Sequence, residues 1–178
     1  MFPRVEWHTG SRQSTIPSMQ ISLTKTSAQR HLLEIVRTNG TRETIELVTR
    51  EALFHDFLHY AVESTLPTQG GFWGTLASGK TMADLNDRSG ESVKENAKTL
   101  YRVEGIVGVM TNVVGMPVDQ ALAKLRWFSE SQDQEPPEWC TEAFVAEVIE
   151  RMRRLQGQWK ATPYGESMEI DWLETEQD

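Results

Sequence analysis

The sequence predicts a single α+β domain, in which an antiparallel sheet (an N-terminal three-strand meander plus a C-terminal hairpin) packs against four to five helices. Asn39-Gly40 lies between two β-rich runs and predicts a hairpin, because both residues tolerate positive φ. Apolar residues recur at helical spacing through the middle of the chain, and apolar and polar residues alternate again near its end. We place the domain at residues 19–174 and expect residues 1–18 to be a flexible N-terminal extension.

The strands of this sheet are expected in two regions. In the N-terminal region they cover residues 19–25, 31–38 and 42–48. In the C-terminal region, the turn signal at 163–165 separates two short alternating segments, one around Trp159 and the other around Trp172. The two regions together predict one sheet built from both ends of the domain.

Four longer helices are expected between these regions. Their predicted ranges are 50–65, 92–114, 118–130 and 137–156. Thr49 is a suitable N-cap for the first helix, and Ser92 with Glu95 forms a capping-box pair for the second. Gly157 is expected to end the last helix.

Net charge, hydropathy and cysteine content indicate which partners and which compartment to expect. The formal net charge of −8 opposes binding to phosphate backbones, so we expect no nucleic acid partner. No apolar run approaches the roughly 20 residues that span a bilayer, so we expect no membrane partner either. Cys140 is the single cysteine, which excludes an intrachain disulfide and is typical of a reducing compartment. We therefore expect an acidic cytoplasmic protein, with Cys140 as a buried core residue.

Residues 74–81, GTLASGKT, match the pattern of a nucleotide-binding P-loop. A P-loop needs a buried parallel strand that leads into the first glycine, but LPTQGGFW precedes Gly74 and does not resemble such a strand. The alternative is a junction of two short helices, in which Gly79 ends the first and Thr81 caps the second together with Asp84. We favour the junction and keep the nucleotide loop as a remote alternative.

A metal site is the clearest chemical hypothesis. His55, Asp56, His59 and Glu63 form a polar stripe on the first expected helix. Histidines four residues apart are a recurring ligand pair for zinc and similar divalent transition metals. The third ligand is not evident: His8 lies in the extension, and His31 lies at the start of a strand. The competing interpretation is that these side chains bond one another without a metal.

One family resemblance involves the same segment. The order His31, His55-Asp56 and Asp119 resembles the ligand order of HD-type phosphohydrolases. That resemblance implies a nearly all-helical fold, whereas His31 falls in an expected strand.

The tryptophans could serve either as core residues or as a surface for a partner. Five of them fall at positions expected to be buried or half-buried: Trp73, Trp127, Trp139, Trp159 and Trp172. The alternative is an exposed patch for a protein partner or a homo-oligomer. We therefore expect a non-catalytic binding or assembly module, with a metal-binding protein or metal-assisted hydrolase as the alternative.

Overall fold

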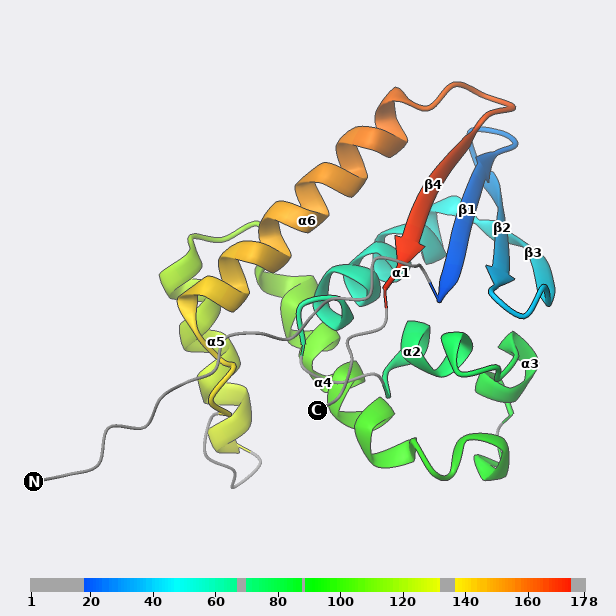
Figure 1. Cartoon of the computed structure of the whole chain (residues 1–178). Coiled ribbons are helices and arrows are strands. Elements are labelled where there is room, and N and C mark those ends of the chain that lie inside the picture. The colour runs from blue at the N-terminus through cyan, green and yellow to red at the C-terminus, as the bar shows by residue number, and fades with distance from the viewer. Residues whose placement is uncertain (1–17, 67–69, 88, 132–136, 174–178) are drawn as a thin grey trace, which may run out of the picture.

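The computed structural model describes residues 18–66, 70–87, 89–131 and 137–173. These residues form a four-stranded antiparallel sheet in the order β3-β2-β1-β4, which confirms the predicted α+β class (Figure 1). The strands are β1 (Met19–Lys25), β2 (Arg30–Arg37), β3 (Arg42–Val48) and β4 (Ser167–Trp172). The helices are α1 (Thr49–Glu63), α2 (Phe72–Ala77), α3 (Met82–Leu85), α4 (Ala97–Val113), α5 (Val118–Ser131) and α6 (Glu142–Ala161), with one 3-10 turn at Glu91–Val93.

Strand β1 is central, and its register sets the buried face of the sheet. Ile21 lies opposite Ile35 on β2 and opposite Ile170 on β4, so three apolar side chains form a row across the sheet. All three are at most 8% exposed. Successive strand side chains point to opposite faces, so the alternation in the sequence buries one face and leaves the other polar.

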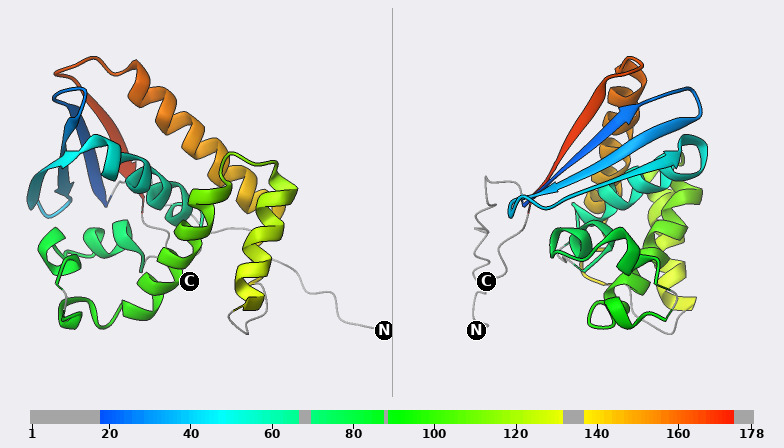
Figure 2. Two further views of the ribbon diagram at one scale, coloured as in Figure 1. Left: turned by 180° about the vertical axis from the view of Figure 1, so that it is seen from behind. Right: turned by 90° about the vertical axis from the view of Figure 1, so that its right-hand side faces the viewer.

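Helices α1 and α6 cover the buried face, and α4 and α5 extend the helical layer away from the sheet (Figures 1 and 2). Helix α1 is buried on several sides because it contacts the sheet, α2, α4 and α6. On the open face of the sheet, Ser22 donates a 2.8 Å hydrogen bond to Glu169. The fold therefore places the polar stripe of α1 between packed elements.

The predicted C-terminal hairpin is wrong in its first strand. Trp159 and Ala161 belong to α6, which runs through Gly157 instead of ending there. The stripe of Met152, Leu155 and Trp159 continues at helical spacing and packs on the core, so the helix tolerates an interior glycine. Only β4 remains of the hairpin, paired with β1 as the prediction of one sheet requires.

Two helix starts also differ from the predicted ones. Helix α4 begins at Ala97, because the Ser92 hydroxyl donates to Asp87 in the preceding loop instead of capping a helix. Helix α6 begins at Glu142, where the Thr141 hydroxyl accepts a hydrogen bond from the Phe144 amide. The predicted N-cap Thr49 is the first residue of α1, and its hydroxyl bonds to His31.

The tryptophans are mostly core residues. Trp73 and Trp172 are 2% exposed, and Trp139 and Trp159 are partly buried against the core. Trp127 is 65% exposed, so the prediction of burial is wrong there. Helix α5 buries only one side, through Ala121, Leu122 and Leu125, and Trp127 lies on its other side. Cys140 is buried, as expected.

Residues 1–17 are outside the described residues, and so is most of the predicted extension, including His8. Within the residues that the structure describes, no helix is both long enough and apolar enough to cross a membrane.

Candidate metal-binding site

Helices α1 and α4 bring three potential metal ligands together. His55 and His59 lie one turn apart on α1, with ring centroids 4.5 Å apart. Glu104 on α4 approaches the same point, so that one ligand atom from each residue lies within 4.8 Å of the others. His59 is 1% exposed, whereas the side chain of Glu104 is 51% exposed and His55 is also exposed. The cluster is therefore buried at His59 and open to solvent at His55 and Glu104.

Glu63 contacts this cluster and is not one of its three candidate ligands. Its Oε1 accepts a 2.9 Å hydrogen bond from His59 Nδ1. Its carboxylate also accepts hydrogen bonds of 2.9–3.3 Å from the backbone amides of Phe72, Trp73 and Gly74. These bonds cap the N-terminus of α2. With four donors the acceptor sites of Glu63 are occupied, and its role is to orient His59.

The second ring nitrogen of His59 is the unusual atom of the site. Nε2 is buried and has no hydrogen-bond partner among the described residues. Glu104 Oε1 lies 3.3 Å away, at ion-pair distance but without hydrogen-bond geometry. Burial alone lowers the pKa of His59, but the carboxylates of Glu104 and Glu63 outweigh that effect and raise it to about 9. At neutral pH the His59 ring is therefore protonated, and Nε2 becomes an electron-pair donor only when it loses that proton.

Asp56 is buried and is not one of the three candidate ligands, although the sequence predicted it as a ligand. Its backbone carbonyl accepts the Trp73 indole N–H at 3.1 Å. Its carboxylate atom Oδ2 is buried without a hydrogen-bond partner in the described part of the chain. Burial raises the pKa of this carboxyl to about 7, and the charge of His59 only partly opposes the shift.

This buried carboxyl predicts a stability that falls as the pH rises. The folded-state pKa lies above the unfolded value, so the folded state holds the proton more tightly and loses relative stability from about pH 4 to pH 7. We expect Asp56→Asn to be more stable than the wild type at pH 8, by an amount on the order of 2–4 kcal/mol, and to lose that advantage towards pH 5. Urea unfolding between pH 5 and 8 with a chelator present measures this, and a difference independent of pH contradicts it.

The other histidine considered as a third ligand lies elsewhere. His31 on β2 is fully buried, its Nδ1 is 3.1 Å from the Thr49 hydroxyl, and its ring contacts Trp159. It is not part of the cluster, and Asp119 lies on α5 outside it. The ligand order shared with HD-type phosphohydrolases therefore does not correspond to a convergent set here.

The P-loop pattern is a helix junction, as the sequence favoured. Gly74 lies inside α2, Gly79 has a φ of 101° after that helix, and Thr81 forms a capping box with Asp84 at the start of α3. The described sheet is entirely antiparallel. The motif amides of Gly74 and Thr81 donate to Glu63 and Asp84, and those of Thr75, Ser78, Gly79 and Lys80 donate to backbone carbonyls, so they are not free for a phosphate. This arrangement argues against the nucleotide-binding alternative.

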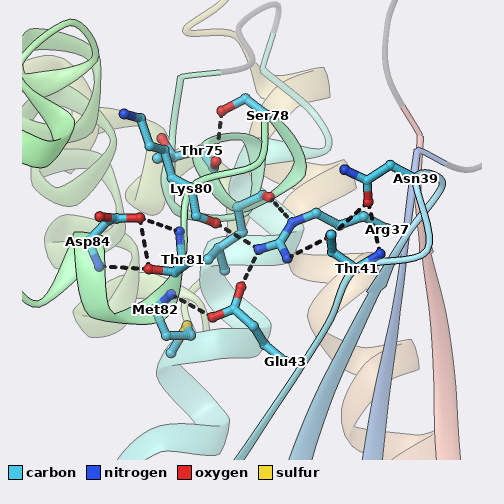
Figure 3. A network of polar contacts seen from close by, with 11 residues as sticks. Arg37, Asn39, Thr41, Glu43, Thr75, Ser78, Lys80, Thr81, Met82 and Asp84 are labelled. Carbon is cyan, nitrogen blue, oxygen red and sulfur yellow. Dashed lines mark hydrogen bonds and ion pairs between the residues drawn. The ribbon is translucent and has the colours of Figure 1, made fainter.

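Hydrogen bonds and an ion pair of Arg37 connect this junction to the sheet (Figure 3). The guanidinium on β2 is 5% exposed and donates to the carbonyls of Leu76 at 2.6 Å and Lys80 at 2.7 Å. It also pairs with Glu43, whose other oxygen accepts the Met82 amide at the start of α3 at 2.9 Å. The α2–α3 segment is thus held by backbone carbonyls, with Glu43 completing the contact.

Glu104 is the candidate ligand that the sequence did not single out. It is the single carboxylate in α4 and lies beside the buried stripe of Val103, Ile106 and Val107. A lone acid next to such a stripe is the signal that could have identified it. Comparisons with protein-family models, curated proteins and solved structures find no match for this chain, so the site is interpreted from its own geometry.

Proposed function

We propose that this protein binds a divalent transition metal ion, with zinc the best match, through His55, His59 and Glu104. The single observation that carries the proposal is the buried Nε2 of His59, which lies 3.3 Å from Glu104 Oε1 and has no hydrogen-bond partner among the described residues. Two imidazoles and one carboxylate are a ligand set that zinc accepts. A site of three protein ligands leaves the fourth position to water or to another ligand.

The separation of the ligand atoms supports this set. Tetrahedral zinc with bonds of about 2.0–2.2 Å requires ligand atoms about 3.3–3.6 Å apart. His59 Nε2 and Glu104 Oε1 are 3.3 Å apart, and all three ligand atoms lie within 4.8 Å. Binding of one ion by all three residues therefore requires the ligand atoms that are up to 4.8 Å apart to move closer together.

The support from Glu63 is of the kind found around bound metals. A ligating histidine commonly donates its other ring N–H to a carboxylate, which fixes its orientation and raises its basicity. His59 makes this contact through Nδ1, leaving Nε2 for the metal. Since carboxylates raise the pKa of His59, a metal that binds Nε2 displaces a proton.

Titration of metal-free protein with Zn²⁺ tests the proposal. We expect a dissociation constant of about 1 μM or tighter at neutral pH, proton release on binding, and one equivalent bound. Glu104→Gln is expected to weaken binding by at least about 100-fold, since loss of an outer partner alone commonly costs 10- to 100-fold. Calorimetry in two buffers of different ionisation enthalpy measures both affinity and proton release.

The control is Glu130→Gln, which removes an exposed carboxylate from α5 outside the cluster. Its affinity for Zn²⁺ should equal that of the wild type. Co²⁺ as a spectroscopic probe should give the intense visible bands of a tetrahedral site in the wild type and in Glu130→Gln only. Wild-type protein that binds no metal, or Glu104→Gln that binds it equally well, would overturn the proposal.

The binding or assembly module remains the second candidate. The observation that favours it is Trp127, whose large apolar ring is 65% exposed on α5. A protein partner or a second copy of the chain would cover such a residue. Metal-assisted hydrolysis stays a prediction, because the cluster by itself supplies ligands and identifies no substrate.

A further inference from the structure

A pocket of about 360 Å³ lies between α4, α5 and the segment that precedes α6. Its volume is in the range of small-molecule sites. The residues that line it include Tyr101 and Ile106 of α4, Leu125 and Phe128 of α5, and Pro137 and Trp139 of the segment before α6. Neither histidine of the metal cluster nor Glu104 is among them, so this pocket is a separate feature of the molecule.

The walls of the pocket are mostly apolar, and the two helices that form them lie close together. Aromatic and aliphatic side chains from three segments supply its walls. Gly105 lets the two helices approach, because a Cβ at this position would lie 2.9 Å from the Phe128 ring. Trp139 packs against Phe144 of α6, with ring centroids 4.9 Å apart, so its indole is held in place. An apolar cavity favours a ligand with a hydrocarbon or aromatic body.

The same pocket has cations at its edge. Lys98 and Arg102 lie one turn apart on α4, both line the pocket, and both are exposed. No ion pair between described residues involves either of them. Burial raises the pKa of the Cys140 thiol, and the charge of Arg126, which does not line the pocket, partly offsets this rise. Such a concentration of cations stands out in a chain with a net charge of −8.

We propose that this pocket binds a medium-chain carboxylate, with the hydrocarbon chain among the apolar walls and the carboxylate paired with Arg102 and Lys98. An arginine offers a carboxylate two parallel N–H donors, and a lysine one turn away adds a second charge. At about 30 Å³ for each heavy atom, as for a water molecule, the cavity holds on the order of a dozen such atoms. Decanoate has that size and chemistry. This inference is independent of the proposed metal site.

Calorimetric titration with decanoate tests the proposal, with decanol as the uncharged molecule of the same chain length. We expect decanoate to bind with a dissociation constant below about 1 mM and decanol to bind at least about tenfold more weakly. Arg102→Gln should weaken decanoate binding about tenfold and leave decanol binding unchanged. Lys124→Gln, which removes an exposed cation of α5 outside the pocket, is the matched control and should behave as the wild type.

A second variant locates the binding site. Ser129→Phe places a ring in the pocket from a half-buried position on α5 and should abolish binding of both molecules. Circular dichroism and the melting temperature show whether this variant is folded. If it is not folded, the comparison of Arg102→Gln with Lys124→Gln decides. Failure of the wild type to bind decanoate, equal binding of decanol, or undiminished binding by folded Ser129→Phe overturns the proposal. A failure to bind zinc leaves it unaffected.

Discussion

Glu63→Gln is expected to lower the free energy of unfolding by about 3–5 kcal/mol, the range for breaking a buried charged contact. The carboxylate is 1% exposed and accepts hydrogen bonds from His59 and from three amides of α2. Glutamine replaces one acceptor oxygen by a donor, which faces N–H groups and leaves at least one of them unsatisfied. Equilibrium urea denaturation, followed by far-UV circular dichroism, measures the change.

Two further variants define this effect. Glu51→Gln alters an exposed acid in the first turn of the same helix, and its effect should stay below about 1 kcal/mol. Gly71→Ala leaves the carboxylate intact but places a methyl group 2.3 Å from Glu63 Cδ, so it should also destabilise the protein. A Glu63→Gln protein as stable as Glu51→Gln would contradict the assignment of Glu63 as the cap of α2.

Arg37→Met is expected to destabilise the protein by about 3–5 kcal/mol. It leaves the carbonyls of Leu76 and Lys80 without their donor and leaves Glu43 without its cation. Since these carbonyls flank the turn at Gly79, we also expect faster amide hydrogen exchange in the α2–α3 segment. Denaturation and hydrogen-exchange mass spectrometry provide the two readouts.

Arg30→Met on the same strand is the control. Its ion pair with Glu46 is about half exposed on both sides, and such pairs contribute about 0–1 kcal/mol. Arg37→Lys keeps the charge but not the planar set of donors, so its effect should lie between those of the two methionine variants. Equal stability of Arg37→Met and Arg30→Met would show that the junction does not depend on the guanidinium.

Local signals in the sequence predict most of the fold. The Asn39-Gly40 turn, the alternation in the strands and the Thr81–Asp84 capping pair all depend on nearby residues, and the structure has each of them. The errors occur where a distant contact outweighs a local preference. Gly157 is a helix-ending residue in isolation, but packing of Trp159 on the core carries α6 past it.

In the candidate site, too, the sequence predicts what depends on local spacing and misses what depends on distant contacts. The helical spacing of His55 and His59 is local, and the structure brings the pair together as the spacing indicates. Glu104 joins them because α1 and α4 pack together, a contact that one sequence does not reveal. Glu63 was expected as a ligand, but the approach of α2 gives its carboxylate other partners.

The pairing of β1 with β4 has a consequence for biosynthesis. Ser22 and Glu169, neighbours in the finished sheet, are 147 positions apart in the chain. While the ribosome is still translating the helices, the hairpins of β1, β2 and β3 can assemble, but one side of β1 has no partner. Until β4 is synthesised, β1 therefore has an edge of unpaired backbone groups, and the apolar surface that Met168, Ile170 and Trp172 later cover is exposed. Chaperones recognise nascent surfaces of this kind.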